Sequence, residues 1–178
     1  ELTKTTIART YRLIEWRLVL ERGRRERTER DTPTQRLLTR LLEDKEIHAI
    51  ERLFRLLGLS YPGEDVATIY RGLRSGRGDV RSSSRELVEH LLEQPLRDAV
   101  LGLIDDGNDA ERLALAGPFH VRQVTSYEAV LAELLEAAAE GLRSISVYHI
   151  GELGLSELRP RLEALDSGDH AVLDRVLR

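Results

Sequence analysis

The chain has 178 residues, of which 41% are hydrophobic, 33% are charged and 4% are aromatic, and this composition suits one folded domain and excludes a disordered tail. The absence of cysteine excludes a disulfide scaffold, a zinc ribbon and a thiol nucleophile. A formal net charge of -4 argues against a globally basic nucleic-acid binder, and no apolar run reaches the length of about 18 residues that a membrane span needs. Methionine is also absent, so we interpret the chain as a piece of a longer protein with no visible secretory leader.

The first 30 residues predict a helix followed by an arginine-rich linker. Apolar residues recur at helical spacing from residue 4 to residue 22, and the only tryptophan, Trp16, lies beside this stripe, where core or interface packing is expected. A cationic run follows, and it is a candidate contact for an anionic surface, for phosphates or for a partner: Arg22, Arg24, Arg25, Arg27 and Arg30. The interleaved Glu21, Glu26 and Glu29 favour the alternative that the run is paired locally.

Residues 31–178 predict a second region made of helices and short turns. Asp31-Thr32-Pro33 is a helix start signal, and the stripe that follows it predicts a long helix ending at Gly58. Further helices are expected near 64–75, 79–92, 96–104, 110–116, 127–140, 142–153, 156–165 and 171–177. Leucine dominates and β-branched alternation is missing, so no strand is expected and the fold class is all-α.

The sequence predicts that the helices are arranged as antiparallel pairs. Arg81, Arg112 and Arg143 are separated by 31 residues each, and Arg175 follows 32 residues later. A period near 30–45 residues with two helices in each unit is typical of an α-solenoid, here with about four repeats. A helix pair cannot bury its own apolar face, and stacking against the next pair does so.

The units at 79–105 and 141–165 resemble HEAT repeats of the armadillo-like class. In that family an Asp near the helix start caps it and an Arg shortly after forms a ladder between neighbouring units. The resemblance assigns these structural roles to Asp79, Arg81 and Arg143. Gly141 replaces the Asp of the second unit, and Asp169 has no Arg at the matching place, so the ladder is incomplete.

A narrower resemblance rests on three runs, at residues 51–59, 69–76 and 151–158. They are similar to the HEAT-repeat region of bacterial nucleotide (ADP/ATP) translocase-like membrane proteins, over roughly residue 34 to the end. The resemblance implies a cytoplasmic domain at the inner face of the membrane, joined to a preceding membrane domain. It transfers no transport chemistry, because the transporting spans are not in this chain.

No motif predicts catalysis or a bound cofactor. The five histidines form no H-E-x-x-H pair, and Gly76-Arg77-Gly78 lacks the Lys of a phosphate loop. Ser82-Ser83-Ser84 has no nucleophile elbow, and the acidic loop at 105–109 does not have the spacing of an EF-hand. We therefore expect no enzyme and no catalytic, cofactor-binding or metal-binding residues.

Three function classes remain, and a scaffold is the first of them. A non-catalytic helical repeat would mediate contacts with a protein partner or an adjacent domain of its own chain. The alternative is a nucleic-acid binder that uses the basic N-terminal region, but residues 41–178 carry 16 basic against 25 acidic residues, so no nucleic acid is expected. A small-ligand sensor is the third class, and no pocket signature supports it.

Overall fold

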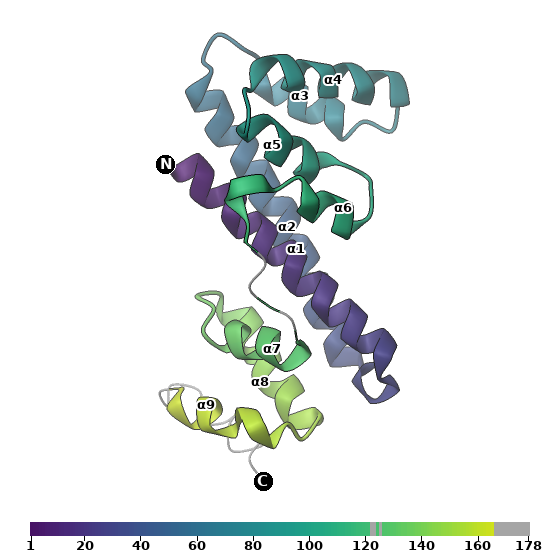
Figure 1. Ribbon diagram of the computed structural model, residues 1–178, viewed down its shortest axis with the longest axis vertical. Coiled ribbons are helices and arrows are strands. Elements are labelled where there is room, and N and C mark those ends of the chain that lie inside the picture. Colours follow the sequence, from purple (N-terminus) through teal and green to yellow (C-terminus); the bar gives the residue numbers. More distant parts are fainter. Residues whose placement is uncertain (122–123, 125, 166–178) are drawn as a thin grey trace. The chain divides into compact units, whose positions relative to one another are not determined.

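The structure is a computed structural model that describes residues 1–121, 124 and 126–165, and within this part every regular element is a helix (Figure 1). The all-α prediction is therefore confirmed for the described residues, whereas the solenoid of paired repeats stays a prediction. The expected helix at 171–177, with Asp169 and Arg175, lies outside the described residues. The α-helices are α1 (Leu2–Glu26), α2 (Pro33–Ser60), α3 (Val66–Leu73), α4 (Gly78–Leu91), α5 (Leu96–Ile104), α6 (Asp109–Ala114), α7 (Tyr127–Leu135), α8 (Glu140–Glu152) and α9 (Arg159–Ala164). Short 3-10 turns are η1 (Thr28–Arg30), η2 (Gly117–Phe119) and η3 (Ser156–Leu158).

The chain divides into two units that are each formed by two stretches of sequence. Unit 1 comprises residues 1–15 and 44–122, and unit 2 comprises residues 16–43 and 123–178. Helices α1 and α2 contribute residues to both units. The division that the sequence predicts, at residue 30, stays a prediction.

Side-chain caps explain where two of the helices begin. The Thr32 hydroxyl accepts a hydrogen bond from the Gln35 N–H at 3.1 Å, and Pro33 occupies the first helical position of α2. Asp65 caps α3 by accepting from the Thr68 N–H at 3.0 Å. The predicted end of α2 at Gly58 is wrong, because Gly58 does not have a left-handed backbone and the helix continues to Ser60.

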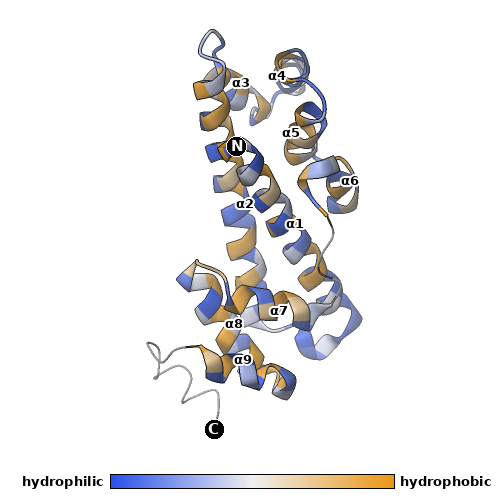
Figure 2. Ribbon diagram, turned by 60° about the vertical axis from the view of Figure 1, so that its left-hand side comes forward, coloured by the Kyte–Doolittle hydropathy of each residue, from blue (hydrophilic) through white to orange (hydrophobic). Residues whose placement is uncertain are grey.

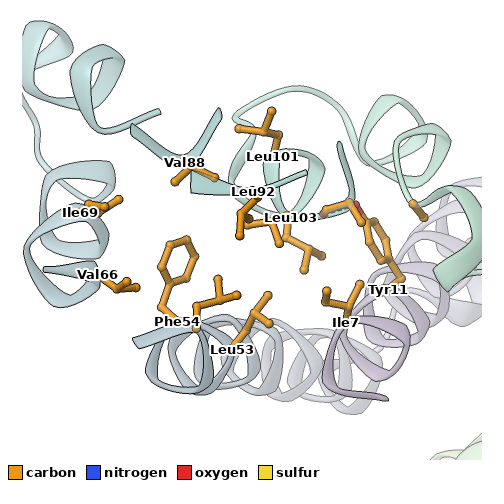
Figure 3. Packing of buried hydrophobic residues seen from close by; sticks show 14 of the residues in the cluster. Ile7, Tyr11, Leu53, Phe54, Val66, Ile69, Val88, Leu92, Leu101 and Leu103 are labelled. Atoms are coloured by element: carbon orange, nitrogen blue, oxygen red, sulfur yellow. Dashed lines mark hydrogen bonds between the residues drawn. The ribbon is translucent and has the colours of Figure 1, made fainter. Parts of the chain in front are cut away.

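The core of unit 1 joins α1, α2, α3, α4 and α5 (Figure 3). Its fully buried side chains include Ile7 and Tyr11 of α1, Leu53 of α2 and Leu103 of α5. The Tyr11 hydroxyl donates to the Ala99 carbonyl oxygen at 2.7 Å, so this buried phenol is satisfied by the backbone of α5.

The long stripe of α2 is only partly buried. Leu53, Phe54 and Leu57 are at most 3% exposed, whereas Leu37 is 54% exposed. Leu37 and Leu38 are adjacent and point about 100° apart, and of the two only Leu38 is buried. Figure 2 shows hydrophobic and hydrophilic residues alternating along the helices in this amphipathic manner.

In unit 2, buried apolar residues come from α7, α8, α9, η3 and the unit 2 parts of α1 and α2. Trp16 is 8% exposed, and its indole Nε1 donates to Glu133 Oε2 at 2.8 Å, which is core packing, one of the two expected alternatives. Gly23 lies against the ring of Tyr127 so closely that any Cβ at this position would overlap it. Glycine is therefore required here to let α1 approach the start of α7.

Candidate functional site

A cavity of about 340 Å³ in unit 1 brings together apolar and charged side chains from several elements. We call it the Arg74 groove, and its volume is at the lower end of the range for binding cavities. Its lining comes from α2, α3, the turn after α3, α4, α5, the loop after α5 and α6: Ile47, Ile50, Tyr70, Leu73, Arg74, Ser75, Arg81, Leu103, Ile104, Asp105, Asp106 and Arg112.

One wall of the groove is fixed by aromatic stacking. The rings of Phe54 and Tyr70 stack with centroids 4.8 Å apart and planes 27° apart. Arg74 Nη1 donates to the Tyr70 hydroxyl at 3.1 Å, and its guanidinium carbon lies 5.9 Å from the centroid of the Tyr70 ring. Because Phe54 belongs to the core, this stack connects an exposed guanidinium to the interior of unit 1.

The acidic rim of the groove is neutralised by arginines of α4. Arg81 pairs with Asp106 at 2.6 Å, and Arg85 pairs with Asp105 at 3.0 Å. A backbone hydrogen bond from Gly107, followed by the Arg85 pair, holds the pKa of Asp105 below its ordinary value, although partial burial opposes this. Among the described residues, no carboxylate lies within ion-pair distance of Arg74, although the charge of Glu51 acts on it from further away.

A buried ion pair supports the base of the groove. Arg112 donates to Glu46 Oε1 at 2.6 Å, and both side chains are at most 10% exposed. The same guanidinium donates to the carbonyl oxygens of Gly102 and Leu103 at 3.2 and 3.1 Å and to Asp109 at 3.1 Å. These bonds connect α6 to α2 and α5, which is a structural role. Sequence reasoning noted Arg112 only for its spacing and missed Glu46, because its partner is 66 residues away.

Unit 2 holds a series of hydrogen bonds that runs from its interior to its surface. Tyr127 Oη lies 2.6 Å from His149 Nε2, and His149 Nδ1 lies 3.0 Å from Glu152 Oε2, which also accepts from the Thr32 hydroxyl at 2.7 Å. The Arg30 guanidinium lies 4.3 Å from the centroid of the Tyr127 ring and pairs with Glu128. His149 is fully buried, whereas Glu152 at the end of these hydrogen bonds is exposed.

The pKa shifts of Tyr127, His149 and Glu152 indicate which of these groups carry protons. Burial raises the pKa of Tyr127, so its hydroxyl stays protonated and donates to Nε2. Burial lowers the pKa of His149, against the opposing effect of Glu152. Burial alone raises the pKa of Glu152, but hydrogen bonds from Thr32 and His149 outweigh it and keep the pKa below its ordinary value. The consistent arrangement is a neutral His149 that donates from Nδ1 to an ionised Glu152.

The arginines of the N-terminal cationic run differ in their partners and in their exposure. Arg24 pairs with Glu21 at 2.8 Å and with Asp31 at 3.4 Å, while Arg22 approaches Glu26 at 3.8 Å. Arg30 is buried against unit 2 residues, and the exposed members of the run are Arg22, Arg25 and Arg27. The run is thus not a continuous cationic surface, and its role in partner contacts stays a prediction.

The residues assigned to the repeat ladder belong to both units. Asp79 is in the first turn of α4, where its carboxylate pairs with Arg77 at 2.7 Å, and this hydrogen bond lowers its pKa. The N-cap position itself is Arg77. Arg81 belongs to the Arg74 groove, and Arg143 is a partly buried residue of α8 in unit 2. Their ladder role stays a prediction.

A second cavity of about 600 Å³ in unit 1 lies beside the start of α1. Its walls include Ala8, Leu57, Pro95, Pro118 and Phe119. It is larger than the Arg74 groove, but Glu1 and Lys4 are the only charged residues in its described lining, whereas the groove has five, and charged and polar groups provide specificity in binding sites. We therefore take the Arg74 groove as the candidate site.

Among the described residues, no three His, Asp or Glu side chains gather in positions that would hold a metal ion. No described helix combines the length and hydropathy needed to cross a bilayer. Comparison with models of known protein families, with curated proteins and with solved structures found no match for this chain.

Proposed function

We propose that this chain is a non-catalytic helical scaffold that docks a segment of another protein, or of an adjacent domain, in the Arg74 groove. The observation that carries the proposal is the combination of an apolar floor with a fixed, charged rim in one cavity. Binding surfaces commonly have this composition, with apolar contacts that provide affinity and polar groups that provide orientation.

The floor of the groove leaves apolar surface in water that a partner would cover. Ile47 is 38% exposed, and Ile50, Leu73 and Ile104 are only partly buried where they pack on the core. Covering such side chains is favourable, at about 25 cal/mol for each Å² removed from water. The floor is held by the core of unit 1, so little order needs to be gained on binding.

The location of the scaffold is a separate part of the proposal. The three runs at 51–59, 69–76 and 151–158 support a HEAT-like appendage of a transporter-like membrane protein, placed in the cytoplasm at the inner face of the membrane. Sequencing the gene upstream of the Glu1 codon tests this part. Several apolar spans of about 20 residues would support it, and a start codon close by without such spans would contradict it.

A nucleic-acid binder remains the alternative function, and the contacts of the N-terminal arginines favour it less. Arg24 and Arg30 are engaged by carboxylates of this chain, so binding phosphates would require breaking those pairs. Titration with a DNA duplex at several salt concentrations tests this alternative, because phosphate contacts make affinity fall steeply with salt.

The scaffold proposal is tested by selecting random peptides on the purified chain and measuring their binding to groove variants. Ile47→Glu places a charge on the apolar floor, and Leu59→Glu makes the same change on α2 at a position that is 80% exposed and outside the groove. We expect the selected peptides to lose binding to Ile47→Glu and to keep it with Leu59→Glu. A selection that yields no peptide, or peptides equally sensitive to both changes, contradicts docking in this groove. Far-ultraviolet circular dichroism confirms that both variants are folded.

A further inference from the structure

We infer that the occupant of the Arg74 groove is a peptide segment that carries a carboxylate next to an aliphatic side chain, and that Arg74 binds this carboxylate. The inference rests on the proposed function, because it identifies the chemistry of the partner that the groove accepts. Three features support it: the charge around the groove, the fixed position of Arg74 and the exposed aliphatic floor.

The charge around the mouth of the groove is positive. The charged residues of its lining are three arginines, Arg74, Arg81 and Arg112, and two acids, Asp105 and Asp106, in a chain whose net charge is -4. The two lining acids, Asp105 and Asp106, are already paired with Arg85 and Arg81. A partner carboxylate therefore meets an attractive field, whereas a partner cation is repelled.

Arg74 is positioned to receive an anion. Its Nη1 is hydrogen-bonded to Tyr70, whose ring is stacked on the core residue Phe54, so the guanidinium is partly ordered before any ligand arrives. Glu51, the acid whose charge is felt by Arg74, is itself paired with Arg55 at 2.5 Å. The remaining N–H groups of Arg74 form the planar fork that binds a carboxylate through two parallel hydrogen bonds.

The floor adds a requirement for an aliphatic group. Ile47, Leu73 and Ile104 line the same cavity as Arg74. A free carboxylate would leave these side chains exposed, and a purely apolar segment would leave Arg74 without an acceptor. A peptide that presents both groups satisfies both parts of the cavity, as short segments do when they dock an amphipathic face into a groove.

The test uses synthetic peptides of about 12 residues that combine Leu or Ile with Asp or Glu. Each is paired with a version in which every carboxylate is replaced by its amide. Binding to the full chain is measured by fluorescence anisotropy. Arg74→Gln removes the groove cation, and Arg71→Gln is the matched control, since Arg71 is an exposed residue of the same helix that bonds to Thr68 and does not line the groove.

We expect the acidic peptides to bind and their amide versions to bind at least about tenfold more weakly. Arg74→Gln should weaken the acidic peptides by a similar factor and leave the amide versions unchanged, and Arg71→Gln should change neither. If binding depends on Ile47 but not on the carboxylates or Arg74, the inference is wrong and the scaffold proposal stands. If no peptide binds, the scaffold proposal fails as well. Stronger binding of a DNA duplex, lost in Arg74→Gln, would overturn the inference in favour of a phosphate ligand.

Discussion

The hydroxyl of Tyr127 and the Nε2 atom of His149 lie 2.6 Å apart in the interior of unit 2, where Tyr127 is 3% exposed and His149 is fully buried. The bond joins the first residue of α7 to α8, and it requires His149 to be neutral while Tyr127 donates. This hydrogen bond between α7 and α8 therefore depends on the protonation state of a single imidazole.

Mild acid should destabilise the protein through His149. Its pKa in the folded state is below the ordinary 6.5, so the unfolded chain binds more protons as pH falls through 6.5, and the free energy of unfolding decreases. Glu152, whose folded pKa is below 4.5, contributes stability that is lost only as the pH falls below 4.5. Urea unfolding between these two pH values thus isolates the histidine. We expect His149→Gln to flatten the pH dependence and His90→Gln, at an exposed position, to leave it unchanged; equal slopes for all three proteins would contradict this assignment.

Breaking the ion pair of Arg112 and Glu46 should lower the free energy of unfolding far more than breaking an exposed pair. Arg112→Met removes the cation from a buried carboxylate and should cost about 3–5 kcal/mol of unfolding free energy. Arg55→Met removes the exposed partner of Glu51 and should cost under about 1 kcal/mol. Both are measured by urea unfolding at neutral pH. Similar losses for the two variants would show that Arg112 does not support the base of the groove. The double variant Glu46→Leu with Arg112→Met should recover part of the loss, because no buried charge is then left without its partner.

Gly102 should not tolerate a side chain. A Cβ there would lie 2.5 Å from the Tyr11 hydroxyl oxygen and 2.7 Å from Leu115 Cβ, so Gly102→Ala must displace α1 or the end of α6. We expect a loss of about 1–3 kcal/mol from overpacking. Gly63→Ala is the control, since nothing lies within 4 Å of its added Cβ. Thermal unfolding of both variants checks the prediction, and an unchanged midpoint for Gly102→Ala would contradict the close approach of these elements.

Replacing two different leucines of α2 by alanine should lower the free energy of unfolding by very different amounts. Leu57 is 1% exposed and belongs to the core of unit 1, so Leu57→Ala should cost about 2–5 kcal/mol. Leu59 is 80% exposed, and Leu59→Ala should cost under about 0.5 kcal/mol. Chemical unfolding compares the two, and a loss below about 1 kcal/mol for Leu57→Ala would mean that the core does not include this part of α2.

The helices could be predicted from the sequence because their signals are local. Leucine spacing predicts α2, and Pro33 and Asp65 mark the starts of α2 and α3. The ends of the helices are less clearly marked in the sequence. The sequence predicts one helix from 127 to 140, but residues 136–139 separate α7 from α8 there. No Gly or Pro marks this interruption, so propensity alone gives no signal for it.

The candidate site could not be predicted, because its members are brought together by tertiary packing. The Arg74 groove takes residues from Ile47 to Arg112, and the pairing of Glu46 with Arg112 spans 66 positions. His149 is fully buried, and its contact with Tyr127 likewise depends on tertiary packing. Only Glu152, three residues from His149, offered a local signal for a partner.

Each unit is formed by two separate stretches of sequence, and this limits which gene fragments can encode a complete unit. Any continuous fragment that holds all of unit 1 also carries residues 16–43, which belong to unit 2. A continuous fragment with all of unit 2 likewise carries residues 44–122. Recombination at a single point in the gene therefore cannot transfer either unit complete and alone. A gene fragment that encodes one unit complete always encodes part of the other unit as well.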